Sequence, residues 1–156
     1  MLKKKFMNIF GISATLGLFF GIAIFALSLF IDIKYVGFRM KGEWPIILGI
    51  IFLTFWGIVT TWTMVSLPIS MRGEKLVTVG IYTYVRHPLY SAAIFLFYPG
   101  IAFILRSWVI LASTILVYLN FKWIIIFEER YLIQKFGKAY REYMKRVNGF
   151  FPKLSK

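Results

Sequence analysis

The sequence predicts an all-α fold, a polytopic membrane helical bundle with about four transmembrane helices and a carboxyl-terminal amphipathic helix on the cytoplasmic side. Three observations predict it: the composition, four long apolar runs and the distribution of basic residues. Of the 156 residues, 60% are hydrophobic and 20% are aromatic, and the mean hydropathy is +0.75. A water-soluble domain of this size is too small to bury so much apolar surface, so we expect lipid to cover it. We expect one integral membrane domain, residues 1–156.

The expected transmembrane helices are four apolar runs, which cover residues 9–31, 45–69, 89–105 and 107–127. At 1.5 Å per residue, the first two exceed the roughly 30 Å hydrocarbon core of a bilayer. Pro68 predicts a stop or kink in the second run, and Pro99-Gly100 predicts a bend or break in the third. Because Arg106 alone separates the last two runs, we expect them to form a tight helical hairpin. Residues 32–44 have the character of a mixed-charge loop.

Small residues recur at four-residue spacing in the first run, at Ser13, Gly17 and Gly21. Such a stripe lets two helix backbones approach closely in lipid. It serves either as a dimer seam or as the surface on which the chain's own second helix packs, and we favour the second interpretation. The sequence leaves the oligomeric state open.

The basic residues indicate which side of the membrane each loop faces. The net charge of +13 fits either nucleic acid or an anionic inner leaflet, and the apolar content favours the lipid bilayer, with no nucleic-acid partner. The amino-terminal segment, the second loop and the chain from Lys122 onward carry 3, 3 and 9 Lys or Arg residues, whereas the first loop and the third turn carry 3 and 1. Cytoplasmic loops are enriched in these residues, so we expect both termini in the cytoplasm.

The residue types exclude several kinds of chemistry. The absence of cysteine excludes disulfides, thiol catalysis and thiolate metal sites. With a single histidine, His87, we expect no metal site.

Residues 128–147 have the pattern of an amphipathic helix. Apolar and aromatic side chains recur every three or four residues on one side, and most of the basic residues fall elsewhere. A basic, aromatic helix of this kind can lie in the membrane surface. The residues on its apolar side are Leu132, Phe136, Tyr140, Tyr143 and Val147.

Two polar clusters lie at the cytoplasmic ends of the apolar runs. His87 stands in Arg86-His87-Pro88-Leu89-Tyr90, where the proline restricts it to extended backbone geometry. Glu128 and Glu129 follow the fourth run without a cation three or four residues away. Such acids either have a partner elsewhere, namely Arg86, His87 or a cationic ligand, or begin a new helix and complement its dipole.

The two clusters and their surroundings resemble a known family. Leu76–Tyr90 has the sequence Leu-Val-Thr-Val-Gly-Ile-Tyr-Thr-Tyr-Val-Arg-His-Pro-Leu-Tyr. After one apolar hairpin comes Glu128-Glu129-x-x-Leu132-x-x-x-Phe136-Gly137-x-x-Tyr140-x-x-Tyr143, then Pro152. The order and spacing are similar to those of the isoprenylcysteine carboxyl methyltransferases and their phospholipid methyltransferase relatives. The resemblance extends from Leu76 to Pro152, about half of the chain.

The resemblance implies a membrane enzyme that uses S-adenosylmethionine to methylate a lipophilic acceptor, either a lipid amine or a prenylcysteine-like carboxylate. Methyl transfer from a sulfonium mainly requires positioning and desolvation of the reactants. The donor's carboxylate is expected at Arg86 and His87, and its ammonium at Glu128 or Glu129. The other expected donor-site residues are Pro88 and Gly137, with Tyr90, Phe136 and Tyr140 near the adenine.

Three residues are expected to take part in catalysis: His87, Glu129 and Arg86. An amine acceptor must lose a proton, which His87 or Glu129 would take, whereas a carboxylate acceptor needs no base. Asn120 and Lys122 are expected to meet the acceptor's headgroup. Asn120 serves equally as a hydrogen-bonding contact between helices, which we prefer.

Two other classes of protein stay open. A nicotinamide-dependent lipid reductase on a similar scaffold must hold a second phosphate-bearing nucleotide half, and the sequence shows no Gly-rich phosphate loop. A non-enzymatic small membrane protein would bind no cofactor. It would also leave the spacing between His87 and the acid pair without a reason.

Overall fold

The fold is a bundle of helices, with no β-strand in the described part of the chain. The computed structural model describes residues 2–34, 39–67 and 75–153, with side chains from residue 15 onward. Its long helices are α1 (Leu2–Lys34), α2 (Trp44–Ser66) and α5 (Trp108–Arg146). A further helical stretch follows the short 3₁₀ helix η3 (Gly80–Thr83) and combines α3 (Pro88–Ala92), the π-helical turn η4 (Ala93–Phe97) and α4 (Tyr98–Ile104).

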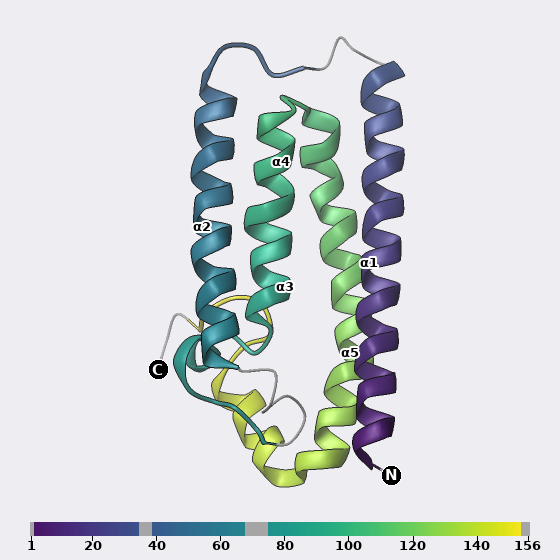
Figure 1. The fold of residues 1–156 in the computed structure, drawn as a ribbon, viewed down its shortest axis with the longest axis vertical. Coiled ribbons are helices and arrows are strands. Elements are labelled where there is room, and N and C mark those ends of the chain that lie inside the picture. The colour runs from purple at the N-terminus through teal and green to yellow at the C-terminus, as the bar shows by residue number, and fades with distance from the viewer. Residues whose placement is uncertain (1, 35–38, 68–74, 154–156) are drawn as a thin grey trace.

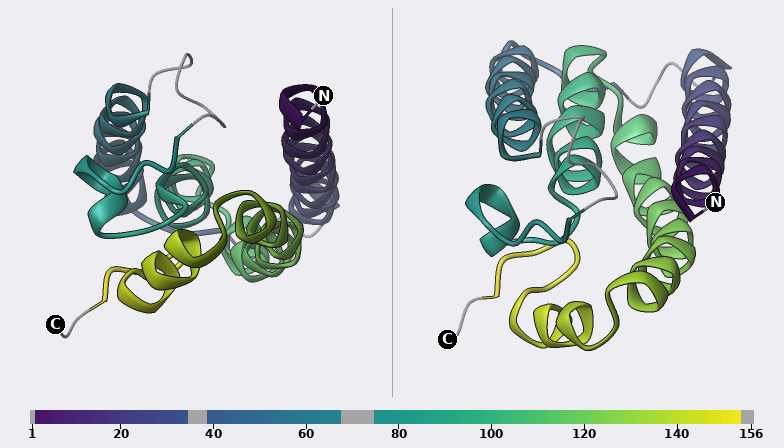
Figure 2. Two further views of the ribbon diagram at one scale, coloured as in Figure 1. Left: turned by 90° about the horizontal axis from the view of Figure 1, so that it is seen from below. Right: turned by 60° about the horizontal axis from the view of Figure 1, so that its bottom comes forward.

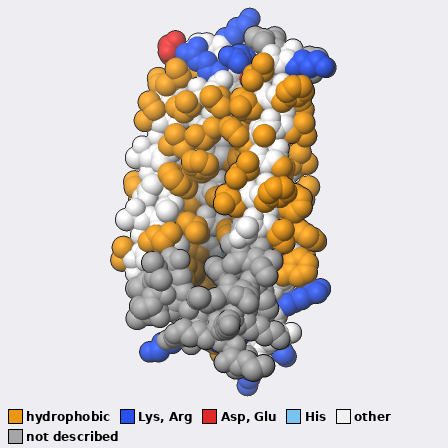
Figure 3. Space-filling model, turned by 45° about the vertical axis from the view of Figure 1, so that its right-hand side comes forward, with side chains coloured by type: hydrophobic (Ala, Val, Ile, Leu, Met, Phe, Trp, Pro, Cys, Tyr) orange, Lys and Arg blue, Asp and Glu red, His pale blue; other side chains and the backbone are white. Residues whose placement is uncertain are grey.

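The helices stand side by side in the order α2, α3–α4, α5, α1 (Figure 1). Three helices of the described chain, α1 from Thr15, α2 and α5, are long and apolar enough to cross a bilayer, and Pro88–Ile104 is a shorter apolar stretch. On the face drawn in Figure 3, hydrophobic side chains form a band with Lys and Arg side chains at both ends. The chain is therefore the all-α, multi-pass membrane bundle that the sequence predicts.

The two ends of the bundle are built differently, and we name them for that. The closed end contains the end of α1, the beginning of α2 and the turn between α4 and α5. The open end contains residues 75–91 and 128–150. The beginning of α1 and the end of the described chain both lie at the open end (Figure 1).

Glycines allow the helices to approach closely. A Cβ atom added at Gly49 of α2 would lie 3.0 Å from the carbonyl oxygen of Gly100 in α4. One added at Gly17 of α1 would lie 2.9 Å from a side chain of α5. Gly17 therefore packs against the chain's own helix, but that helix is α5 and not the expected second helix. Gly21 meets nothing within 4 Å, and the side chain of Ser13 lies outside the described residues.

The α4–α5 hairpin closes one end of the bundle, as expected from the short separation of the two runs. It turns at Arg106, whose φ is 56°. The Ser107 hydroxyl accepts a hydrogen bond from the Ile110 amide at 3.1 Å and donates one to Asp32 Oδ1 at 2.6 Å. Asp32 is 1% exposed and accepts a second bond from Arg39 at 3.4 Å. The loop was expected to begin at residue 32, but α1 continues to Lys34. Asp32 is therefore a buried acid within α1 that connects this helix to the hairpin.

The bend expected at Pro99-Gly100 takes a different form. The helix continues through these residues, and the π-helical turn Ala93–Phe97 precedes them. Proline has no amide hydrogen to donate to the carbonyl four residues earlier, and a wider turn accommodates that missing bond. The stretch Pro88–Ile104 is helical throughout. The stop expected at Pro68 lies outside the described residues.

Helix α5 continues past the expected boundary between the fourth transmembrane run and the cytoplasmic helix. It is helical through Glu128 and Glu129, so the acids do not begin a new helix. The direction changes at Gly137, whose φ and ψ are 55° and −124°, a conformation that strains residues with a Cβ atom. We call residues 108–136 the first leg of α5 and residues 138–146 its second leg. The second leg turns across the open end (Figure 2), and its apolar side packs on other apolar residues of the protein.

Candidate functional site

The segment that carries His87 is held by the end of the described chain. The amide of Arg86 donates to the Asn148 carbonyl at 2.9 Å, and the amide of His87 donates to the Gly149 carbonyl at 3.0 Å. Pro88 then occupies the first turn of α3, where a helix leaves amides unpaired, so its missing amide hydrogen costs no bond. His87 is thereby fixed on a non-helical backbone, with φ −124° and ψ 63°.

His87 lies between the two acids. Its Nε2 donates to Glu129 Oε1 at 3.1 Å, and its Nδ1 is 3.7 Å from Glu128 Oε1. The Tyr90 hydroxyl donates to Glu128 Oε2 at 3.1 Å, and its ring stacks on His87 with 5.9 Å between centroids. His87 and Glu128 are both buried, so the two polar clusters of the sequence meet in the interior. Within the described residues, no group of three or more His, Cys, Asp or Glu side chains could hold a metal ion.

Arg86 makes four hydrogen bonds to protein atoms with its guanidinium group. Its Nε and Nη2 donate to Glu129 Oε1 at 3.0 and 2.6 Å. Its Nη1 donates to the carbonyl oxygens of Met144 and Val147 at 3.1 and 2.6 Å. These carbonyls belong to the end of α5, where a helix leaves acceptors without partners. Each of the three guanidinium nitrogens therefore donates a hydrogen bond, either to Glu129 or to the carbonyls at the end of the second leg.

The two glutamates have different surroundings and titrate differently. The part of α5 before the acids, residues 108–127, is roughly 30 Å long at 1.5 Å per residue, about the thickness of a bilayer core, so we place both acids outside the spanning part. Burial raises the pKa of Glu128 above its usual range, although His87 and Tyr90 oppose that shift. Burial also acts on Glu129, but the hydrogen bond and charge of His87, together with Arg86, lower its pKa below the usual range. Glu129 thus already has ion-pair partners in Arg86 and His87, whereas Glu128 is an acid that a cationic ligand would help to ionise.

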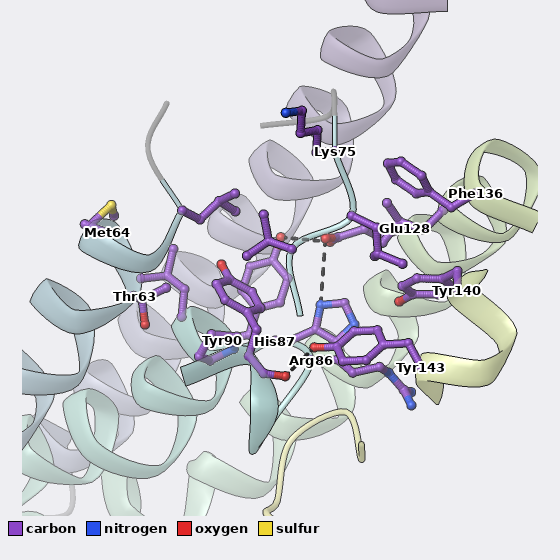
Figure 4. A pocket seen from close by; sticks show the side chains of 17 residues that line it. Thr63, Met64, Lys75, Arg86, His87, Tyr90, Glu128, Phe136, Tyr140 and Tyr143 are labelled. Atoms are coloured by element: carbon purple, nitrogen blue, oxygen red, sulfur yellow. Dashed lines mark hydrogen bonds and ion pairs between the residues drawn. The ribbon is translucent and has the colours of Figure 1, made fainter. Parts of the chain in front are cut away.

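A cavity of about 340 Å³ opens beside Glu128 (Figure 4). Ligand sites typically occupy roughly 300–1,000 Å³, so a small organic molecule fits it. The end of α2, the segment 75–90 and both legs of α5 form its wall. The lining residues are Thr63, Met64, Leu67, Lys75, Leu76, Val77, Tyr82, Arg86, His87, Pro88, Leu89, Tyr90, Glu128, Leu132, Phe136, Tyr140 and Tyr143.

Tyr140 brings to this cavity a buried hydroxyl without a hydrogen-bond partner. The residue is 2% exposed, and its oxygen bonds to nothing in the structure. Tyr143, one turn further, instead donates to the Tyr82 carbonyl at 2.6 Å. Burial raises the pKa of Tyr140, so its hydroxyl stays neutral and can both donate and accept. An unpaired buried hydroxyl is unfavourable by about 1–3 kcal/mol, and a ligand with a polar atom would remove that cost.

Most of the expected donor-site residues line the cavity. The exceptions are Glu129, which lies on the other side of His87, and Gly137. A Cβ atom added at Gly137 would meet nothing within 4 Å, and the non-helical φ and ψ of this glycine change the direction of α5; its expected close approach to a ligand stays a prediction. The residues that the structure places at the cavity as expected are Arg86, His87, Pro88, Tyr90, Glu128, Phe136 and Tyr140.

The two residues expected to meet the acceptor headgroup are not part of the lining. Asn120 Nδ2 donates to the carbonyl of Gly17 at 3.1 Å and so links α5 to α1. The Lys122 ammonium lies 5.9 Å from the centre of the Tyr118 ring on the same helix. Asn120 therefore makes the preferred contact between helices, and the acceptor roles of both residues stay predictions.

Several residues of the site were missed from the sequence. Thr63, Met64 and Leu67 are ordinary members of an apolar run, and no signal marks them. The segment 148–150, which holds Arg86 and His87, carries no signal either, because it acts through backbone carbonyls. Tyr143 lies within the second family-like motif, so its position could have been proposed.

Comparison with known proteins finds a family match and a partly similar relative. Residues 16–139 match the profile of a family described as phospholipid methyltransferase, and this match contains both polar clusters. A segment of 82 residues, 52% of the chain, is 38% identical to the protein-S-isoprenylcysteine O-methyltransferase of Schizosaccharomyces pombe (strain 972 / ATCC 24843). That segment covers 34% of the yeast protein, so the chain matches about a third of this relative's length.

Proposed function

This chain belongs to the phospholipid methyltransferase family, and from that premise we propose that it transfers a methyl group from S-adenosylmethionine to a lipophilic, membrane-resident acceptor. One observation supports the proposal most strongly. The cavity at the open end is lined by Glu128, a buried acid of raised pKa, and by Tyr140, whose buried hydroxyl has no hydrogen-bond partner. Both groups gain from a ligand that carries a cation and polar ring atoms.

The lining fits the three parts of such a donor. Glu128 is the acid for its ammonium group. Lys75, an exposed cation of the wall, is our candidate for its carboxylate. Phe136 and Tyr140 supply apolar ring surface for the adenine, and the Tyr140 hydroxyl supplies a hydrogen bond. When bound, S-adenosylmethionine supplies a methyl group already activated by its sulfonium.

The protein's own residues mainly orient and desolvate the reactants. Tyr90 and His87 approach different oxygens of Glu128 and so fix the direction of its carboxylate. Leu89 and Leu132 line the cavity and limit its contact with water. An amine acceptor must lose a proton, and His87, which contacts both acids, is our candidate to accept it or to pass it to Glu129. A carboxylate acceptor needs no such step.

We propose that the acceptor reaches the cavity from the bilayer. Met64 of α2 and Leu89 of α3 are 42% and 38% exposed and also line the cavity, so apolar surface is continuous from the outside of the bundle to the site. The open end faces the cytoplasm in this proposal, because most of the Lys and Arg residues belong to it or to the termini. Both a lipid amine and a prenylcysteine-like carboxylate are compatible with this route.

A labelling experiment tests the proposal. Purified protein in lipid nanodiscs is incubated with S-[methyl-³H]adenosylmethionine and a total lipid extract, and the labelled products are separated and identified. We expect a labelled lipid, and binding of S-adenosylmethionine but not of NADPH. Failure to bind S-adenosylmethionine, or selective binding of NADPH, would contradict the proposal and favour the reductase alternative or a non-enzymatic protein.

A further inference from the structure

The inference concerns Arg86 and rests on the proposed function. Arginine beside a donor site is readily taken for the ligand of the donor's carboxylate, and the sequence suggested that role. The geometry points instead to a positioning residue: we propose that Arg86 and Glu129 form a brace that fixes the angle between the two legs of α5, and thereby the shape of the donor site.

The guanidinium group of Arg86 makes four hydrogen bonds to protein atoms. Its Nε and Nη2 both donate to Glu129 Oε1, and its Nη1 donates to the Met144 and Val147 carbonyls. Every nitrogen thus has a partner within the protein. Four of its five N–H groups are thus used, so a donor carboxylate could form a two-pronged contact with this side chain only by breaking charge-assisted bonds that are already short.

The hydrogen-bond partners of Arg86 lie on both legs of α5. Glu129 belongs to the first leg of α5, whereas Met144 and Val147 lie at the end of the second leg. Gly137, between them, has non-helical φ and ψ, and a Cβ atom added there would meet nothing within 4 Å, so a contact that spans both legs helps to fix the angle between them. Arg86 bridges both legs from the loop before α3 and supplies that contact.

The two legs that the brace connects both line the cavity. The first leg contributes Glu128, Leu132 and Phe136 to the wall, and the second leg contributes Tyr140 and Tyr143. His87, which follows Arg86 in the chain, donates to the same Glu129 oxygen that Arg86 holds. Loss of the brace therefore moves the two walls apart and releases His87 from its position beside Glu128.

A donor analogue separates positioning from direct binding. We compare the Kd of S-adenosylmethionine and of decarboxylated S-adenosylmethionine for the wild type, Arg86→Gln and Arg86→Lys. A brace predicts that Arg86→Gln weakens both donors by the same factor, roughly tenfold or more, because the lost contact is not with the carboxylate. Arg86→Lys stays impaired, since one ammonium cannot replace the planar fork. A loss that appears with S-adenosylmethionine and vanishes with the decarboxylated analogue would overturn the proposal, as would an unchanged Kd.

A second set of variants covers the case in which Arg86→Gln does not fold. Glu129→Gln removes the other half of the brace and predicts the same equal loss with both donors, and the double variant is no worse than either single one. The exposed pair Lys138–Glu142 on the second leg provides the matched control, because Glu142→Gln leaves both Kd values unchanged. Additive losses from Arg86→Gln and Glu129→Gln would contradict a shared role.

Hydrogen exchange tests the brace without any donor, so its failure is distinct from failure of the proposed function. In the wild type, the amides of Arg86 and His87 are protected by the carbonyls of Asn148 and Gly149. We expect these amides to exchange at least tenfold faster in Glu129→Gln and unchanged in Glu142→Gln. Unchanged protection in Glu129→Gln would refute the brace even if the protein binds no donor at all.

Discussion

Both ends of the bundle bury a carboxylate, and the described residues line a cavity beside the one at the open end. At the closed end, Asp32 accepts bonds from Ser107 and Arg39, and the α4–α5 turn covers it. At the open end, Glu128 is buried to a similar degree, receives a bond from Tyr90, and faces a cavity of about 340 Å³. A buried acid is thus a structural tie where its partners complete its surroundings, and a candidate ligand site where they do not.

The largest effect on donor binding is expected at Glu128, the buried acid of the open end. Glu128→Gln keeps the shape of the side chain but removes its charge, so we expect the Kd for S-adenosylmethionine to rise by about tenfold to a hundredfold, equivalent to about 1.5–3 kcal/mol. Isothermal titration of the purified variant measures it. Glu142→Gln, on the exposed face of α5, is the matched control. Equal affinities in Glu128→Gln and the wild type would remove Glu128 from the donor site.

At Asp32, the buried acid of the closed end, we expect a loss of stability without a loss of donor binding. Ser107→Ala removes the bond to Asp32 and the cap of α5, so we expect a loss of about 1–3 kcal/mol in the free energy of unfolding. Denaturant or thermal unfolding measures it, with Thr54→Ala on the exposed side of α2 as the control. The donor Kd of the folded Ser107→Ala protein should match the wild type. A selective loss of donor binding would show that the two ends are not independent.

The pH dependence of donor binding sharpens the comparison. A cationic donor requires ionised Glu128, and burial raises the pKa of this acid, so a larger fraction is neutral at a given pH than for an ordinary glutamate. We therefore expect affinity to fall as the pH is lowered, beginning above the pH range of an exposed carboxyl. The measurement is the Kd between pH 5 and pH 8, and the acid limb should be absent in Glu128→Gln. An identical acid limb in both proteins would assign the titration to another group.

The smallest effect is expected from the unpartnered hydroxyl. Tyr140→Phe removes a polar atom that makes no bond in the structure, so we expect the folded protein to be as stable as the wild type or slightly more so. Donor affinity should fall by about 0.5–1.5 kcal/mol, since the donor loses one hydrogen bond. Tyr143→Phe is the matched contrast, because it breaks the bond to the Tyr82 carbonyl and should cost stability. A Tyr140→Phe protein that is clearly less stable would show that the hydroxyl has a structural partner.

The sequence allowed the helices to be predicted better than their junctions. A helix that faces lipid must be apolar along its length, so a long stretch without charge predicts such a helix directly. The direction of α5 depends on Gly137, where the sequence is compatible with either a close approach to a ligand or a helix break. The burial of Asp32 depends on Ser107, which is 75 residues away in the chain, and no local pattern encodes such a contact.

The site was predictable where its chemistry lies in side chains. His87, Glu128 and Tyr140 were expected from their unusual residue types and spacing, and all three line the cavity. The part formed by α2 was not predictable, because Met64 and Leu67 resemble any other apolar residue of a membrane helix. The contacts of Arg86 were not predictable, since a sequence shows that a cation is present but not which groups it binds.

The most direct test of the account is to map where the methyl donor binds. Purified protein in nanodiscs is photolabelled with an azido-adenine analogue of S-adenosylmethionine, with and without excess S-adenosylmethionine, and the labelled peptides are identified by mass spectrometry. We predict that competed labels fall within residues 75–91 and 128–143, the two segments that meet at the open end. Competed labels near Asp32 and Ser107, or no competed label in the protein, would contradict the placement of the donor at the open end.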